Sequence, residues 1–245
     1  MNRIYSLLIA LTVFAAGAAV AEWAEYPTGD MDSRTSQIQA KVESLYRRGD
    51  FKRAHFIYSK ELAPLGDKYA QYMTGYMHLM GQGVEEDKIR ASAWYRIAAE
   101  RKTPEFLAVR DQLLRTMTSD ELAASDELYL GLRKNYSDLV IVMGLIVEDL
   151  PYLETKRTGS RLAGDTSSVT VIDPNTGFPS SADHLQSRAL RAMQARLDFV
   201  TDKLDINNIR VEEAGAQVDV LWERINDYLG VVDDELDAYV ANPGK

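Results

Sequence analysis

The residue types that most often carry chemistry are few in this chain, and their spacing is not that of a catalytic or metal site. The sequence has three histidines, His55, His78 and His184, and no cysteine. No two histidines have the His-Glu-x-x-His spacing of zinc enzymes, and without cysteine there is no thiolate nucleophile, thiolate metal site or disulfide. We therefore expect structural roles for His55 and His78 and an exposed His184.

Carboxylates are abundant, but they occur in runs such as 85–87 and 233–235 that are typical of solvated surface. The chain has no Gly-x-Ser-x-Gly nucleophile elbow and no Gly-x-x-x-x-Gly-Lys phosphate loop. Arg161, in the segment TGSRLAG, gives only a weak signal for anion binding. The sequence therefore predicts a protein that is not an enzyme and that has no cofactor and no metal site.

Length and composition limit the classes of partner. The chain has 245 residues, 46% of them hydrophobic and 27% charged, which is enough for one large or two small domains with a real core. The formal net charge of −9 disfavours binding to nucleic acid, where basic residues must replace counterions, and to anionic lipid.

The first residues have the pattern of an export signal. Arg3 precedes an uncharged run over 4–20, and Ala19-Val20-Ala21 has the small-x-small pattern of a cleavage site. We expect a signal peptide over 1–21, a lead-in over 22–32 and a periplasmic or secreted protein. The alternative, a membrane anchor, is disfavoured because the run is at the short limit for a span.

The elements that must position any site begin with residues 70–102, which predict two helices and a tight turn. Gly81 and Gly83 can take positive φ and reverse the chain. Asp87 is placed as the N-cap of the second helix. Alanines and the pair Trp94-Tyr95 then form one face that can pack closely on a neighbour. This is the pattern of an αα-hairpin.

Together these positions resemble a Sel1-like repeat, a relative of the tetratricopeptide repeat. The matching residues are Ala70, Gly75, Gly81, Gly83, Val84, Asp87, Ala91, Trp94, Tyr95, Ala98 and Ala99. Thr74 stands where the family usually has Leu, His78 where it has Tyr and Lys102 where it has Gly. The resemblance implies that the matching residues are structural and that the protein acts as a scaffold or adaptor for other polypeptides.

One hairpin cannot bury its own apolar face, so neighbours are expected. The Ala-x-x-Ile-Tyr spacing at 54–58 recurs as Ala-x-x-Trp-Tyr at 91–95, which indicates an upstream pair with a shorter turn. A third pair, 104–117 and 119–135, has a capping box over 118–121 and is expected to form a polar end cap. We predict an all-α fold, with a short solenoid over 33–137.

Stacked hairpins leave a concave face that polypeptides can occupy. We expect Tyr58 and Tyr95 to pack between repeats and Tyr72 and Tyr76 to line the groove that binds a partner protein.

The residues after the array are expected to change in character. Residues 138–155 form a docking segment whose apolar run, 139–147, is helix or strand, with helix slightly favoured and Pro151 ending it. Residues 156–181 are rich in Gly, Ser, Thr and Pro and are expected to be a flexible linker. Alternatively, 167–177 contains a short β-like run that can add to a partner as a strand.

The C-terminal region, 182–240, contains a heptad ladder over 187–232. One set of positions is Leu190, Leu197, Leu204, Val211, Val218, Ile225 and Val232, and the other is Met193, Val200, Asn207, Ala214, Leu221 and Tyr228. We favour one long amphipathic helix with Asn207 as a polar core residue; the alternative is a helical hairpin that turns at 205–208. The coiled coil gives an alternative function, self-association or envelope assembly.

Overall fold

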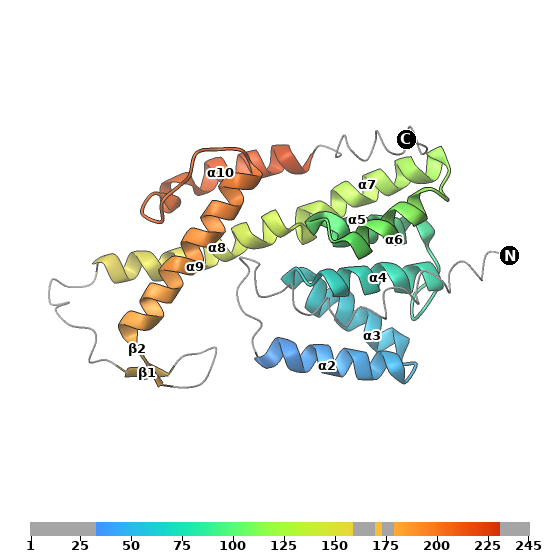
Figure 1. Ribbon diagram of the computed structural model, residues 1–245, viewed down its shortest axis with the longest axis horizontal. Helices are drawn as coiled ribbons and strands as arrows, with labels where there is room; N and C mark the ends of the chain where they lie inside the picture. The colour runs from blue at the N-terminus through green and yellow to red at the C-terminus, as the bar shows by residue number, and fades with distance from the viewer. Residues whose placement is uncertain (1–32, 159–169, 173–178, 231–245) are drawn as a thin grey trace. The chain divides into compact units, whose positions relative to one another are not determined.

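The computed structural model describes residues 33–158, 170–172 and 179–230 (Figure 1). The predicted signal peptide and lead-in, Arg161 and the carboxylates at 233–235 lie outside the described residues, as does the side chain of His184. The chain forms two compact units. We call the one built on Gln37–Asp138 the repeat unit and the one built on Leu139–Tyr228 the C-terminal unit. Of the other described residues, Leu229 and Gly230 belong to the first unit and 33–36 to the second.

The repeat unit is a succession of helix pairs, coloured from blue to green in Figure 1, and it confirms the predicted α-solenoid. Its helices are α2 (Ser33–Arg47), α3 (Phe51–Ile57), α4 (Lys68–Met80), α5 (Lys88–Ala98), α6 (Pro104–Leu114) and α7 (Ser119–Tyr136). Helix α3 continues as a π-helical turn over Tyr58–Leu62 and a 3-10 turn over Ala63–Leu65, and a second 3-10 turn, Ala99–Arg101, follows α5.

Local chemistry fixes the bounds of the α4–α5 hairpin. The Asp67 carboxylate accepts from the Ala70 backbone N–H at 2.8 Å and caps α4, and Gly81, with φ 63°, ends it. Asp87 caps α5 in the same way, through the N–H of Arg90. These caps satisfy backbone groups that a helix end leaves without partners.

Glycines allow close approach at two places in the repeat unit. A Cβ at Gly75 would lie 2.8 Å from the ring of Tyr95 and 3.0 Å from the carbonyl oxygen of Ala91, so α4 and α5 cross where only hydrogen fits. Gly83, with φ 77°, lies against the backbone of Phe51, where a Cβ would be 2.5 Å away. The turn of one hairpin therefore packs directly on the start of α3.

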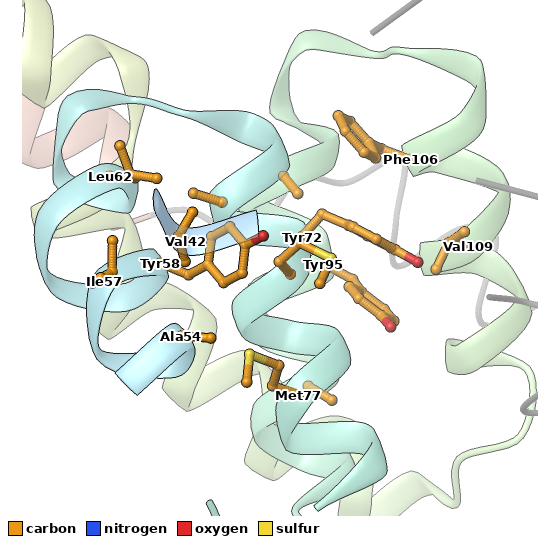
Figure 2. Close-up of a cluster of buried hydrophobic side chains, with 14 of the residues drawn as sticks. Val42, Ala54, Ile57, Tyr58, Leu62, Tyr72, Met77, Tyr95, Phe106 and Val109 are labelled. Carbon is orange, nitrogen blue, oxygen red and sulfur yellow. The ribbon is translucent and has the colours of Figure 1, made fainter. Parts of the chain in front are cut away.

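Buried apolar side chains of successive helices form one continuous core (Figure 2). Tyr72 lies at its centre: its ring is stacked on that of Tyr95 with centroids 5.2 Å apart and on that of Phe106 with centroids 5.6 Å apart. The labelled residues of Figure 2 come from α2 to α6 and are Val42, Ala54, Ile57, Tyr58, Leu62, Tyr72, Met77, Tyr95, Phe106 and Val109. Aromatic pairs of this kind add stabilisation beyond the area that they bury.

Helix α7 packs on α5 and begins with the predicted capping box, which is confirmed. The Thr118 hydroxyl accepts from the Glu121 N–H, and the Glu121 carboxylate accepts from the Thr118 N–H at 2.7 Å. Between the two helices, Arg96 lies over the ring of Tyr129 at 4.1 Å.

A buried polar network holds the end of the repeat unit. Lys68, 4% exposed, lies 2.9 Å from the Glu100 carboxylate and 3.2 Å from that of Asp138. Arg101 donates two hydrogen bonds, of 3.0 and 2.9 Å, to the same Asp138 carboxylate. Glu100 in turn accepts from the Ser137 hydroxyl and from the Asp138 N–H, at the start of the next helix. Each charge is thus paired, as burial requires.

The C-terminal unit begins with helix α8 (Asp138–Thr158), so the apolar run 139–147 is helical, as favoured. The expectation that Pro151 ends this helix is wrong, because α8 continues through it. The predicted linker contains a two-stranded antiparallel sheet, in which β1 (Thr170–Ile172) pairs with β2 (Pro179–Ser181). The β-like run therefore pairs within this chain.

The preferred single C-terminal helix is wrong, and the alternative of two helices holds. Helix α9 (Ala182–Lys203) and helix α10 (Ala214–Leu229) are separated by residues 204–213. Asp205 has φ 51°, and the Ile206 N–H bonds to the Thr201 carbonyl at 3.0 Å, an arrangement that ends a helix in a left-handed residue. Asn207 is exposed in this connection and is not a core residue. Self-association through 187–232 stays a prediction.

Candidate functional site

The repeat unit has a groove of about 1250 Å³. Its lining comes from α3 (His55), the π-helical turn that follows it (Ser59, Lys60), α4 (Thr74, His78), the turn before α5 and α5 itself (Val84, Glu85, Glu86, Asp87, Lys88, Ile89, Arg90, Trp94) and α7 (Glu121, Glu127, Leu128, Gly131, Leu132, Tyr136). This volume exceeds that of most small-molecule pockets. The groove also extends over α3, α5 and α7, which are the second helices of three successive pairs, and a site of this extent suits a polypeptide.

Helical periodicity decides which side of α4 faces the groove. Thr74 and His78 are four residues apart and share one face, and both line the groove. Tyr72 and Tyr76 lie two residues earlier, on the nearly opposite face. The structure corrects the expectation that these tyrosines line a partner groove: Tyr72 is only 3% exposed in the aromatic core, and Tyr76, half-buried, stacks beside it with centroids 6.3 Å apart.

Apolar side chains from α5 and α7 form the floor of the groove. The ring of Trp94 meets that of Tyr136 edge-on, with centroids 4.7 Å apart. Leu128 lines the groove and is 37% exposed, so it leaves apolar surface open to a ligand there. Ile89 and Leu132 complete this floor.

Two imidazoles meet in the groove wall. The rings of His55 and His78 lie 5.1 Å apart, edge to face. Among the described residues, Nε2 of His55 and Nδ1 of His78 have no hydrogen-bond partner, which differs from the satisfied structural role expected for them. Burial, followed by the neighbouring His78, lowers the pKa of His55 to about 4. Burial and Arg90 also lower the pKa of His78. Both rings are therefore neutral at pH 7.

The charged side chains of the groove fall into two groups. Asp87 pairs with Arg90, and Glu121 lies 3.3 Å from Lys88, so these charges are compensated inside the protein. By contrast, Glu85, Glu86 and Glu127 form no ion pair in the part of the chain that the structure describes, and all three are exposed.

Neither a metal site nor a membrane span is found in the described ranges. Within residues 33–158, 170–172 and 179–230, no three histidine, aspartate or glutamate side chains group as metal ligands would. No helix in these ranges combines the length and the apolar character needed to cross a bilayer.

The residues of the repeat signature lie where a stacked hairpin needs them. Ala70, Ala91 and Ala98 are fully buried, and Tyr95 is 1% exposed. Ala99 is buried after α5, and Val84 lies in the turn that lines the groove. Lys102, which replaces a glycine of the pattern, has φ 59°.

These features define a helical-repeat protein with a groove along one face. Residues 68–102, which form the α4–α5 hairpin, match the family model of the Sel1 repeat. Sel1 repeats generally mediate protein–protein interaction. No curated protein matches this chain, and no solved structure matches it.

The departures from the repeat pattern are a sequence signal for this groove. Thr74 and His78, two of the three departures from the repeat pattern, both face it. Leu128 gave no such signal, because a leucine in an amphipathic helix is normally assigned to the core.

Proposed function

We propose that this protein is an interaction scaffold that binds a partner polypeptide in the groove formed by α3, α5 and α7, with no catalytic role. The observation that carries the proposal is the open apolar floor around Leu128, which is framed by charged side chains on a rigid helical repeat. Interfaces of this kind combine an apolar centre with a polar rim. The general role of Sel1 repeats supports it.

Export is part of the same proposal. Residues 1–21 have the composition of a signal peptide, and a protein without cysteine needs no disulfides outside the cytoplasm. N-terminal sequencing of the protein from cell fractions tests this. Cleavage predicts a mature chain that begins at Glu22, and a chain that retains Met1 would contradict export by this route.

Site-specific photo-crosslinking in cells tests the groove itself. A photoreactive residue replaces Leu128 in the groove or, as a matched control, Leu65, which is an exposed apolar residue of the repeat unit outside the groove (37% and 46% exposed). We expect a crosslinked partner protein from position 128 and none from position 65. Crosslinks at 65 without any at 128 would refute the groove as the binding site.

The alternative function, self-association through the C-terminal region, gives a different result in the same experiment. Val220 on α10 is 47% exposed, so a photoreactive residue there reports contacts of that helix. A crosslinked dimer of the chain from position 220, with no partner from position 128, would favour an assembly role over the scaffold.

A further inference from the structure

The groove has more carboxylates than basic side chains, and this excess of negative charge indicates what kind of ligand it binds. Five carboxylates and three basic side chains line it. The ion pairs Asp87–Arg90 and Lys88–Glu121 within the protein neutralise two of the carboxylates and two of the basic side chains. Three carboxylates then face a single remaining cation, Lys60. An occupant with positive charge is attracted to such a surface, and one with negative charge is repelled.

A second, independent observation concerns hydrogen bonding. His78 is 7% exposed and lines the groove, and its Nδ1 has no partner among the described residues; Nε2 of His55 beside it is likewise without one. Buried polar atoms of this kind normally have partners. Because both rings are neutral at pH 7, a nitrogen that carries no proton can accept from an N–H donor.

Arginine satisfies these features together. Its guanidinium carries five N–H donors, always positive, which can bond to carboxylates and to a neutral imidazole at the same time. Its methylene stem packs on apolar surface, which Trp94 and Leu128 supply in this groove. Lysine has the charge but not the planar fork, so it is the weaker fit.

We propose that the groove binds a polypeptide segment that presents arginine side chains to Glu85, Glu86 and Glu127, with apolar residues between them on the Leu128 floor. This rests on the proposed function and names the chemistry of the partner. Other occupants fit less well: a second copy of this chain carries a net charge of −9.

The segments of the chain outside the described residues are also mismatched in charge. Residues 1–32 contain one arginine and four carboxylates, and residues 231–245 contain one lysine and four carboxylates. Residues 159–169 have one charge of each sign, and 173–178 have a single aspartate. None of these segments supplies an arginine-rich occupant, so we assign the arginine-bearing segment to another protein.

The test uses the full chain and a random linear peptide library displayed on phage. Peptides are selected on the parent protein, and each is then measured by fluorescence polarisation against three variants. The groove variant is Glu85→Gln/Glu86→Gln/Glu127→Gln. The matched control, Glu212→Gln/Asp219→Asn/Glu223→Gln, removes equal charge from exposed carboxylates outside the groove. The third variant, Leu128→Ser, reports on the apolar floor.

We expect arginine-rich peptides whose affinity falls about tenfold or more with the groove variant and less than about twofold with the control. Replacing the arginines of a selected peptide by neutral, isosteric citrulline should cause a similar loss.

Two results would overturn the inference but leave the proposed function standing. In the first, the peptides whose affinity falls with Leu128→Ser contain no arginine. In the second, such peptides contain arginine, but their affinity does not change when citrulline replaces it. Equal losses with the groove and control variants would also overturn it, since they indicate general attraction to an acidic protein. If no selected peptide is sensitive to the groove variant or to Leu128→Ser, the proposed function fails too.

Discussion

Gly75 and Gly131 lie inside helices of the repeat unit, yet their surroundings predict opposite effects of the same substitution. Alanine in a helix interior is favoured over glycine by about 1 kcal/mol. At Gly131 in α7 an added Cβ meets nothing within 4 Å, so Gly131→Ala keeps this gain and raises the free energy of unfolding by about 0.5–1 kcal/mol.

At Gly75 the same Cβ would contact groups that cannot move freely. The Tyr95 ring, 2.8 Å away, is held by its stack with Tyr72, and the Ala91 carbonyl oxygen, 3.0 Å away, belongs to the backbone of α5. Overpacking of a core costs about 1–3 kcal/mol. Because two groups are met at 3.0 Å or less, we expect the upper part of this range, about 2–3 kcal/mol. After the helix gain of about 1 kcal/mol is subtracted, Gly75→Ala should lower the free energy of unfolding by about 1–2 kcal/mol.

Urea denaturation of the full chain, followed by circular dichroism, measures both effects. We expect the transition midpoint to fall for Gly75→Ala and to rise for Gly131→Ala, with unchanged slopes. If Gly75→Ala proves as stable as the parent, the helices do not cross as closely as described, and the reasoning from the glycine contact is refuted.

Three further predictions follow from the repeat unit. Lys102→Gly should raise stability by about 1 kcal/mol, because Lys102 has φ 59° and glycine adopts this region without strain; an unchanged urea midpoint would contradict it. Lys68→Met removes the cation between two carboxylates and should lower the urea-derived stability by about 3 kcal/mol, whereas Lys60→Met on the exposed rim should change it little. Because the pKa values of His55 and His78 are lowered in the folded protein, the unfolded chain binds more protons below pH 6.5, and the free energy of unfolding should fall from pH 6.5 towards pH 4. The double variant His55→Gln/His78→Gln should reduce the dependence of the free energy of unfolding on pH in this range. An unchanged pH dependence would exclude the two histidines as its source.

The hairpin of α4 and α5 was predictable because its signals are local. Gly81 and Asp87 each act on the backbone within a few residues, as a terminator and as a cap, and both act so in the structure. The same holds for the capping box at Thr118. Such signals depend little on what packs nearby.

The face used by the groove was not predictable in the same way. Helix α4 is buried on nearly all sides, so its apolar residues do not mark one inward stripe. Tyr72 had the residue type of a binding anchor, but its position between α5 and α6 places it in the core. Only the tertiary arrangement separates Tyr72 from His78.

The break between α9 and α10 shows a limit of heptad counting. A seven-residue spacing reports the side of a helix only while the chain is helical, and the count continues through 204–213 although the helix does not. The competing signal was the turn sequence at 205–208, where Asp205 takes a left-handed conformation.

The polar network around Lys68 determines where the chain can be divided. A fragment ending at residue 137 loses the carboxylate to which Arg101 donates two hydrogen bonds and leaves Glu100 as the only carboxylate paired with Lys68. A fragment that ends some residues beyond Asp138 keeps the charges of this network paired. An isolated repeat unit, or a reporter fused at this junction, should therefore keep Asp138 and have its boundary downstream of that residue.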